Sequence, residues 1–282
     1  VALEQQAPVK YDVDIMVAGG GPAGIAAAVT AARQGMRVYL AEGQGCLGGM
    51  ATAAMLPMFC PFSDGVHFLA GGIGKEIVDQ CMAKGVEGPD PRDLDEKLAS
   101  YVTIHPEPLK RLYDVMVAEA GVQFSFYTQV IGVRKSDESQ VSHVFCAAKS
   151  GIFAVKAKMY IDCTGDGDLA VMAGAPYEKG NANGDLMPGT LISLWAGIDW
   201  SREPIKRWDD GRHYDEAYRD GIFSVDDPGL PGMIRIGESI GAGNIGHAFG
   251  VDSTDEVSLT EAMIEQRRRL PEYVRYYRED ME

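Results

Sequence analysis

The sequence has few basic residues and few cysteines, and each of these features excludes some classes of function. It carries 26 Lys and Arg against 41 Asp and Glu, a formal net charge of −15. That charge repels phosphate backbones, so no nucleic-acid partner is expected. The five cysteines are odd in number and form no CxxC pair, which indicates neither a disulfide framework nor a zinc site. We expect a cytoplasmic protein with a small-molecule substrate.

Long apolar runs and a signal peptide are also lacking. No run approaches the roughly 20 residues of a membrane span, and the first residues lack the basic flank and apolar core of a signal peptide. No membrane partner is therefore expected. The chain begins with Val1 rather than Met, which leaves open that an upstream targeting segment was removed. A hydrophobic content of 46% over 282 residues suits one large domain or two interlocked ones.

The chain also lacks a recognisable metal site. None of its five histidines has a metal-binding partner at helical spacing or lies in an HExxH motif, so we interpret them as surface or structural residues. The segment "DCTGDGDLAVMA" spaces Asp162, Asp166 and Asp168 like calcium ligands, but Ala173 stands where an EF-hand needs glutamate. We predict no metal, and the catalytic residues stay unknown.

What the sequence does contain is a strand, a glycine turn, a helix and a second strand near its start. Gly19, Gly21 and Gly24 follow a short apolar run. In this pattern the first glycine allows the turn, the second lets a pyrophosphate approach, and the third lets helix and strand pack closely. Glu42 ends the second strand about 20 residues further on, where a carboxylate binds a ribose diol. An acid at this position favours FAD or NAD over NADP.

The stretch "DIMVAGGGPAGIAAAVTAARQGMRVYLAEGQGCLGGMAT" resembles the amino-terminal signature of FAD-dependent oxidoreductases of the glutathione-reductase-like superfamily, the flavoproteins with two dinucleotide-binding domains. The "LGGMAT" box and "AGGIGKEI" narrow the resemblance to a bacterial group whose substrates are mostly unassigned. The resemblance implies an α/β fold. It comprises a Rossmann-type FAD-binding domain, with a central parallel sheet and a β-meander, and a second, mixed-sheet α+β substrate domain.

The resemblance also implies which residues bind FAD. They are Gly19, Gly21, Pro22, Ala23, Gly24, Glu42, Gly48, Gly49, Met50, Ala51, Thr52, Val130, Thr164 and Gly165. Many relatives carry Arg or Lys directly after the acid, where this chain has Gly43 and Gln44, so the adenine contacts there are left open. We expect Asp166 or Asp168 to cap the helix that follows the "CTG" turn.

The pattern divides the chain into three parts. Residues 11–60 and 105–175 are predicted to form the FAD-binding domain, 61–104 a helical and loop insertion, and 176–282 a partial substrate domain. Because relatives continue past the position of Glu282, we expect either a missing carboxyl-terminal segment or a homo-oligomer. Residues 122–133 are predicted as one strand, and Ser258 with Glu261 has the spacing of a capping box.

We therefore expect an FAD-dependent oxidoreductase that transfers hydride between a small organic substrate and flavin. Two alternatives remain open. One is a non-redox dinucleotide-binding enzyme, resembling thiazole synthases or RNA-modification enzymes. The other is a non-catalytic fragment that needs a partner chain.

Overall fold

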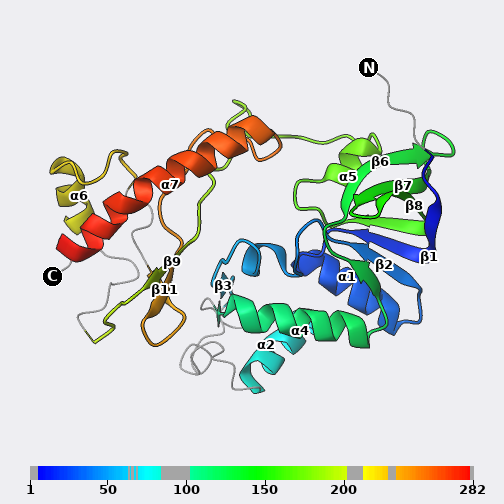
Figure 1. Cartoon of the computed structure of the whole chain (residues 1–282), viewed down its shortest axis with the longest axis horizontal. Helices are drawn as coiled ribbons and strands as arrows, with labels where there is room; N and C mark the ends of the chain where they lie inside the picture. Colours follow the sequence, from blue (N-terminus) through cyan, green and yellow to red (C-terminus); the bar gives the residue numbers. More distant parts are fainter. Residues whose placement is uncertain are drawn as a thin grey trace. The chain divides into compact units, whose positions relative to one another are not determined.

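The computed structural model describes residues 6–62, 64, 67, 69–83, 102–201, 212–227 and 233–279 (Figure 1). They form two compact units. The first comprises Val1–Ala54 and Met58–Tyr177, and the second Met55–Pro57 and Glu178–Glu282. Part of the predicted insertion lies outside the described residues. The three-part domain division stays a prediction.

The first unit begins with β1 (Val9–Ala18), α1 (Pro22–Arg33) and β2 (Val38–Ala41). The last three residues of β1 and all of β2 are buried, as expected of central strands covered on both faces. Pro22 stands in the first turn of α1, where its fixed φ favours the start of a helix. Gly35 follows the helix with a φ of 85°, a conformation that glycine adopts without strain.

The central sheet has six strands in the order β5-β2-β1-β8-β7-β6. The strands from β5 to β8 in that order pair in parallel, and the remaining two pairs are antiparallel. The bounds are β5 (Gln123–Ser125), β6 (Gln129–Lys135), β7 (Val141–Ala148) and β8 (Gly151–Asp162). Because β8 pairs with both β1 and β7, it joins the parallel part to the meander. The predicted fold class, an α/β unit with a mostly parallel sheet and a meander, is confirmed.

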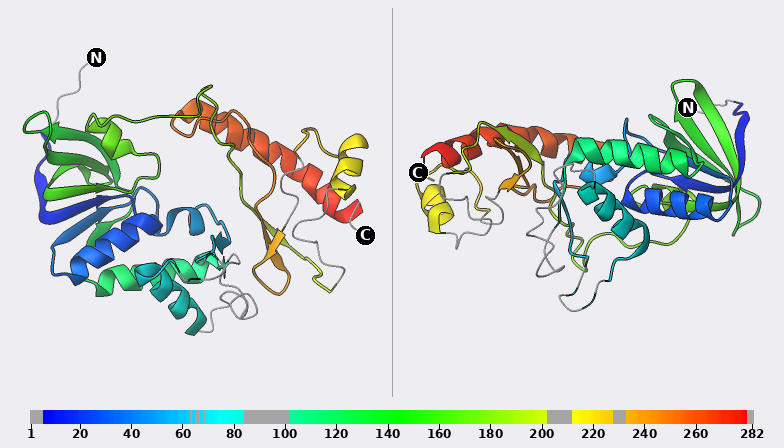
Figure 2. Two further views of the ribbon diagram at one scale, coloured as in Figure 1. Left: turned by 180° about the vertical axis from the view of Figure 1, so that it is seen from behind. Right: turned by 90° about the horizontal axis from the view of Figure 1, so that it is seen from below.

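Two hydrophobic clusters hold this unit together. The first packs α1, α2 (Gly72–Ala83) and α4 (Pro106–Glu119) against β1 and β2, with Ile25, Leu40 and Leu109 at 0–1% exposure. The second is shared by β1, β2 and the meander and includes Met16 and Tyr39. Figures 1 and 2 show these helices on one side of the sheet. A short pair, β3 (Met58–Phe59) and β4 (Val102–Thr103), completes the unit.

Residues 122–133 form two strands and not the single strand predicted. Strand β5 ends at Ser125, and β6 begins at Gln129. Between them Tyr127 has a φ of 50°, and the Thr128 hydroxyl donates to the carbonyl of Phe126 at 3.0 Å. The prediction was wrong because apolar alternation does not reveal a left-handed residue, and the turn sends β6 into the meander.

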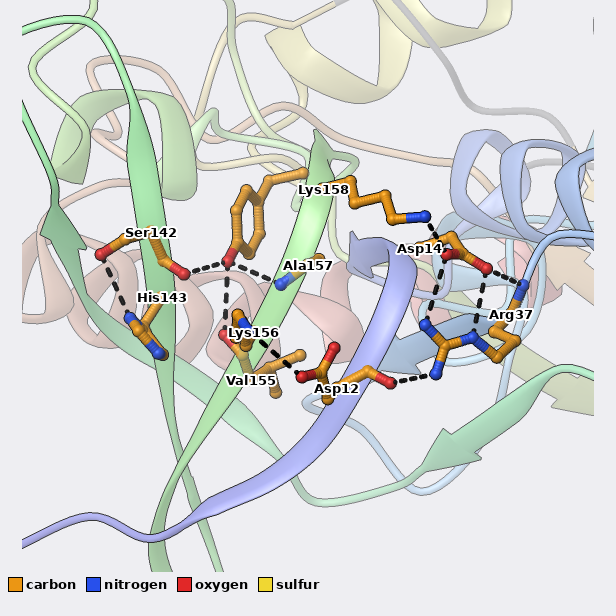
Figure 3. Close-up of polar contacts among 10 residues, drawn as sticks. Asp12, Asp14, Arg37, Ser142, His143, Val155, Lys156, Ala157 and Lys158 are labelled. Carbon is orange, nitrogen blue, oxygen red and sulfur yellow. Dashed lines mark hydrogen bonds and ion pairs between the residues drawn. The ribbon is translucent and has the colours of Figure 1, made fainter.

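Charged side chains connect β1 to its neighbouring strands (Figure 3). The Asp14 carboxylate accepts from the backbone N–H of Arg37 at 2.9 Å and contacts the Lys158 ammonium at 2.8 Å. These contacts, led by Lys158, hold the pKa of the Asp14 carboxyl well below its usual range. Nearby, Lys156 reaches Asp12 at 3.3 Å. The network joins β1 to β8 on one side and to the segment before β2 on the other.

The second unit contains a separate three-stranded antiparallel sheet. Its strands are β9 (Ser193–Ala196), β10 (Met233–Arg235) and β11 (Ile240–Gly243), with β11 in the centre. Helices α6 (Arg212–Arg219) and α7 (Glu256–Glu279) accompany it. Its core includes Phe223, whose ring lies 5.1 Å from those of both Tyr273 and Tyr276.

Helix α7 begins with a different cap from the one predicted. The Asp255 carboxylate accepts the N–H of Ser258 at 2.7 Å, and Ser258 lies inside the helix. The predicted capping box of Ser258 with Glu261 is therefore wrong, since the capping residue lies three positions earlier. No helix in the described part of the chain has the length and apolar character to cross a membrane.

Candidate functional site

Three glycines after β1 play three different roles in the turn. Gly19 has a φ of 93°, and a Cβ there would lie 2.2 Å from the carbonyl oxygen of Cys163. A Cβ on Gly24 would lie 1.9 Å from the carbonyl oxygen of Gly19, so the third glycine lets α1 pack against the turn. A Cβ on Gly21 would meet nothing within 4 Å. Gly21 therefore faces open space, as it would if a pyrophosphate approached its backbone.

The amino terminus of α1 presents backbone N–H groups to the same space. Gly21 is the N-cap residue, no side chain caps the helix, and its first turn contains no acid. Pro22 and Ala23 are exposed. Uncapped N–H groups at a helix start bind anions, and the helix dipole adds to that attraction. The turn thus fits a phosphate-bearing ligand.

Glu42 follows β2 and is 7% exposed. One carboxylate oxygen accepts the N–H of Gly20, and the other accepts the N–H of Gln44, both at 2.6 Å. Each oxygen keeps a further lone pair. The carboxylate is therefore held rigidly beside the glycine turn and can still accept hydrogen bonds from a ribose diol.

The "LGGMAT" box lies against this turn. The N–H of Gly48 donates to the carbonyl of Gly20 at 2.8 Å, and a Cβ on Gly49 would lie 3.2 Å from the Cα of Gly21. Gly49–Ala51 forms a 3-10 turn in which Met50 is 62% exposed and Ala51 is buried. The buried Thr52 donates its hydroxyl to the carbonyl of Leu47 at 2.5 Å, so that hydroxyl stabilises the loop.

The three aspartates of "IDCTGDGD" form a turn at the end of β8. Oδ1 of Asp162 accepts the N–H of Thr164 at 3.0 Å and its hydroxyl at 2.7 Å, while Oδ2 accepts the N–H of Ala170 at 2.8 Å. The helix that follows, α5 (Asp168–Met172), has Gly167 as its N-cap. The prediction that Asp166 or Asp168 caps this helix is therefore wrong, because Asp162 reaches forward and binds its first turn.

The same turn completes one wall of the site. The N–H of Cys163 donates to the carbonyl of Ala18 at 2.7 Å, and a Cβ on Gly19 would come 2.9 Å from the Cα of Thr164. Gly165 has a φ of 98° and open space at its Cβ position. Burial raises the pKa of the Asp168 carboxyl, and its acidic neighbours add to the rise. The described residues contain no group of three or more His, Cys, Asp or Glu side chains placed to hold a metal.

Val130 is placed apart from the other predicted residues. It lies at the start of β6, pairs with Cys146 of β7 and packs against the second hydrophobic cluster. Its neighbour Gln129 reaches Gly43, since a Cβ on Gly43 would lie 2.5 Å from the Gln129 amide nitrogen. The structure thus brings together the turns at 19–24, 42, 48–52 and 164–165, with Val130 next to a residue that touches the loop after Glu42.

The sequence profile of the family described as FAD dependent oxidoreductase matches residues 14–282. This chain belongs to the FAD dependent oxidoreductase family. The glycine turn, the uncapped helix start and the buried carboxylate fit the FAD that this family requires. The finer assignment to a glutathione-reductase-like bacterial group stays a prediction.

Solved structures share the fold of this family member. A geranylgeranyl bacteriochlorophyll reductase-like protein from Thermoplasma acidophilum matches 93% of this chain and 63% of its own, with a TM-score of 0.52 and 16% identity. The myxobacterial chondrochloren halogenase CndH, an FAD-dependent halogenase, matches 92% of this chain and 57% of its own, with a TM-score of 0.50 and 15% identity. At these identities the likeness shows the fold alone.

A third structure, THI4 from Thermovibrio ammonificans, matches 56% of this chain and 59% of its own, with 19% identity and a TM-score of 0.42. At that score the likeness carries no argument about function. The chain spans less than two thirds of each of these three proteins. Among curated proteins, no sequence matches it.

One polar cluster of this family member was not predicted from the sequence. In the second unit, His247 donates its backbone N–H to Asp227 at 2.5 Å, and its Nδ1 lies 2.8 Å from the same carboxylate. Gln266 and Arg269 of α7 both donate to the carbonyl of His247, at 2.9 and 3.0 Å. No motif could have revealed this cluster, since its members are 19 or more residues apart along the chain, apart from the two on α7.

Proposed function

We propose that this chain is part of an enzyme that transfers hydride between a small organic substrate and bound FAD. The observation that carries the proposal is the Glu42 carboxylate. It is buried, fixed by two backbone N–H groups at 2.6 Å, and placed beside an open glycine turn. Membership of an FAD-dependent family supports the same reading.

The residues of the first unit have binding and orienting roles in this proposal. Gly21, Ala23 and the uncapped start of α1 would hold the pyrophosphate, and Glu42 would hold the adenosine ribose. The turns at 48–52 and 164–165 would border the chain that leads to the flavin. FAD supplies the redox chemistry when bound, while the protein positions it and excludes competing reactions.

Two of the cysteines have surroundings that disfavour thiol chemistry. None of the five described cysteines forms a disulfide. Burial raises the pKa of the Cys146 thiol to about 12 and also raises that of Cys163, where Asp162 adds to the rise. A protonated thiol is a poor nucleophile. Thiol–disulfide exchange at these two positions is therefore disfavoured.

Anaerobic reduction of the flavin-loaded protein tests this function. We expect reduced nicotinamide or a panel of small organic donors to bleach the visible absorbance of the flavin, and an oxidised acceptor to restore it. The product of the donor should then be detected by mass spectrometry. The proposal would be contradicted if dithionite bleached the bound flavin but no class of organic donor did.

A further inference from the structure

Tyr127 is an exposed aromatic residue held in an unusual backbone conformation. Among the described residues, only Tyr127 and Met55 combine a side chain with a positive φ, and the Tyr127 value is 50°. A left-handed residue other than glycine or asparagine is strained by roughly 1 kcal/mol or more. Its side chain is 66% exposed, so burial of the ring does not offset that strain. Such strain often marks a functional position.

The sheet order places Tyr127 next to the ribose-binding carboxylate. Strand β2 lies between β1 and β5, and all three run parallel, so their carboxyl ends share one edge. The N–H of Glu42 donates to the carbonyl of Ser125 at 3.0 Å, and the N–H of Tyr127 donates to the carbonyl of Gln44 at 3.1 Å. The turn after β5 is therefore bonded to the loop after β2.

The direction of a bound dinucleotide follows from the same order. Its pyrophosphate would lie over the end of β1, at the glycine turn, and its ribose at Glu42 over the end of β2. The base is joined to the ribose on the side away from the phosphates. It would therefore continue toward the end of β5, where Tyr127 stands.

The loop after Glu42 leaves room for an aromatic ring. Gly43 and Gly45 have no side chains, and Gln44 is exposed. A Cβ on Gly45 would lie 2.2 Å from the hydroxyl oxygen of Tyr127 and 2.7 Å from the ring carbon that bears it. Glycine at 45 thus permits the observed position of the ring. No basic side chain stands directly after Glu42 to cover a base there.

We propose that Tyr127 packs against the adenine of the bound dinucleotide and sets the affinity for its adenosine half. The inference rests on the proposed binding of FAD in the first unit. It depends on the glycines at 43 and 45 and on the left-handed turn at 127. An aromatic ring stacks on adenine through dispersion and does not need a charged partner.

Titrations with ADP, FAD and FMN test the proposal. Tyr127→Ala is expected to weaken binding of ADP and of FAD about tenfold, since stacking on one base contributes on that order. Tyr127→Phe should retain wild-type affinity. FMN lacks adenine, so any affinity for FMN should not change. Tyr177→Ala is the matched control, because Tyr177 is also 66% exposed.

Two further variants separate stacking from folding. Gly45→Ala should displace the ring and weaken ADP binding, but should have no added effect in the Tyr127→Ala background. Tyr127→Gly should relieve the backbone strain, so its thermal midpoint should not fall although its ADP affinity does. Unchanged ADP affinity in Tyr127→Ala would overturn the proposal. Wild-type protein that binds ADP but not FAD would overturn the proposed function alone, and binding of neither would overturn both.

Discussion

At the scale of single residues, the first unit depends on glycines that are needed for opposite reasons. Gly24 is needed because a Cβ would collide with the carbonyl oxygen of Gly19 at 1.9 Å. Gly21 has an ordinary φ of −67°, and its Cβ position is empty. Glycine at 24 is needed for the folded state, whereas glycine at 21 is needed for the approach of a ligand. Substitution by alanine should therefore separate them.

Gly24→Ala should lower the free energy of unfolding by about 1–3 kcal/mol, because backbone must shift to make room. Gly21→Ala should change it by no more than about 0.5 kcal/mol, yet weaken FAD binding about tenfold by blocking the approach of the pyrophosphate. Urea denaturation and FAD titration of both variants measure this. Equal losses of stability in the two variants would contradict the assignment.

A second residue-scale feature is the buried guanidinium of Arg269. The residue is 3% exposed, and its Nε and Nη2 have no hydrogen-bond partner among the residues that the structure describes. Its Nη1 shares the His247 carbonyl with Gln266. A buried charge without a carboxylate partner contributes little to stability and often costs free energy.

Arg269→Met should therefore leave the unfolding free energy unchanged or raise it by about 1 kcal/mol, since Gln266 still satisfies the carbonyl. Asp227→Ala should lower it by about 2–3 kcal/mol, because it removes the acceptor of the His247 backbone N–H. Denaturant titration of the two variants tests the contrast. A loss of more than about 2 kcal/mol in Arg269→Met would show that the guanidinium holds the unit together.

At the scale of elements, the sequence predicted the strands that are marked by runs of apolar residues. It missed the turn and the helix cap that depend on the conformation of a single residue. Buried apolar runs predicted β1 and β2, and the three segments of the meander were recognisable from their turns. The break between β5 and β6 was missed because it depends on one left-handed residue, Tyr127. The cap of α7 was misassigned to Ser258 because Ser258 and Asp255 are both polar residues that can act as an N-cap. The hydrogen bond from the N–H of Ser258 to the Asp255 carboxylate identifies Asp255 as the cap.

The same limits apply to the candidate site. Gly19, Gly24 and Glu42 lie in a motif whose spacing indicates the role of each residue. Their positions in the turn, in the packing of the helix and at the end of β2 could therefore be predicted. The cluster of Asp227, His247 and Arg269 could not, because it forms only when segments distant in sequence pack together. Spacing along the chain carries no signal for such contacts.

The charged network on β1 gives a prediction at the element scale. Because the pKa of Asp14 is lowered in the folded state, its ion pairs stabilise the fold above the unfolded pKa of 3.8. That stabilisation should be lost progressively as the pH falls below 3.8 toward the lowered folded value. Asp14→Asn should therefore be less stable than wild type at neutral pH, and the difference should shrink in acid.

Chemical denaturation at a series of pH values checks this expectation. Asp12→Asn is the control, because Asp12 and Lys156 form an exposed pair with side chains 60% and 56% accessible, and such pairs contribute little. A difference between Asp14→Asn and wild type that stayed constant down to about pH 2 would contradict the role given to Asp14.

At the scale of the whole molecule, we propose that the first unit binds the dinucleotide. The loops that form the site follow β1, β2 and β8, whose carboxyl ends share one edge of the sheet, as expected for ligands of open α/β sheets. The second unit has its own sheet and core, and we propose that it contributes to substrate binding. The reductase-like protein and the halogenase that share this fold are both longer than this chain.

The measurement that tests the central claim most directly is the identity of the dinucleotide that the purified protein holds. The protein is denatured, and the supernatant is analysed by absorption and mass spectrometry, with added FAD titrated into any protein purified without it. We predict FAD, at one molecule per chain. Recovery of NAD without flavin, or no uptake of added FAD, would contradict the account.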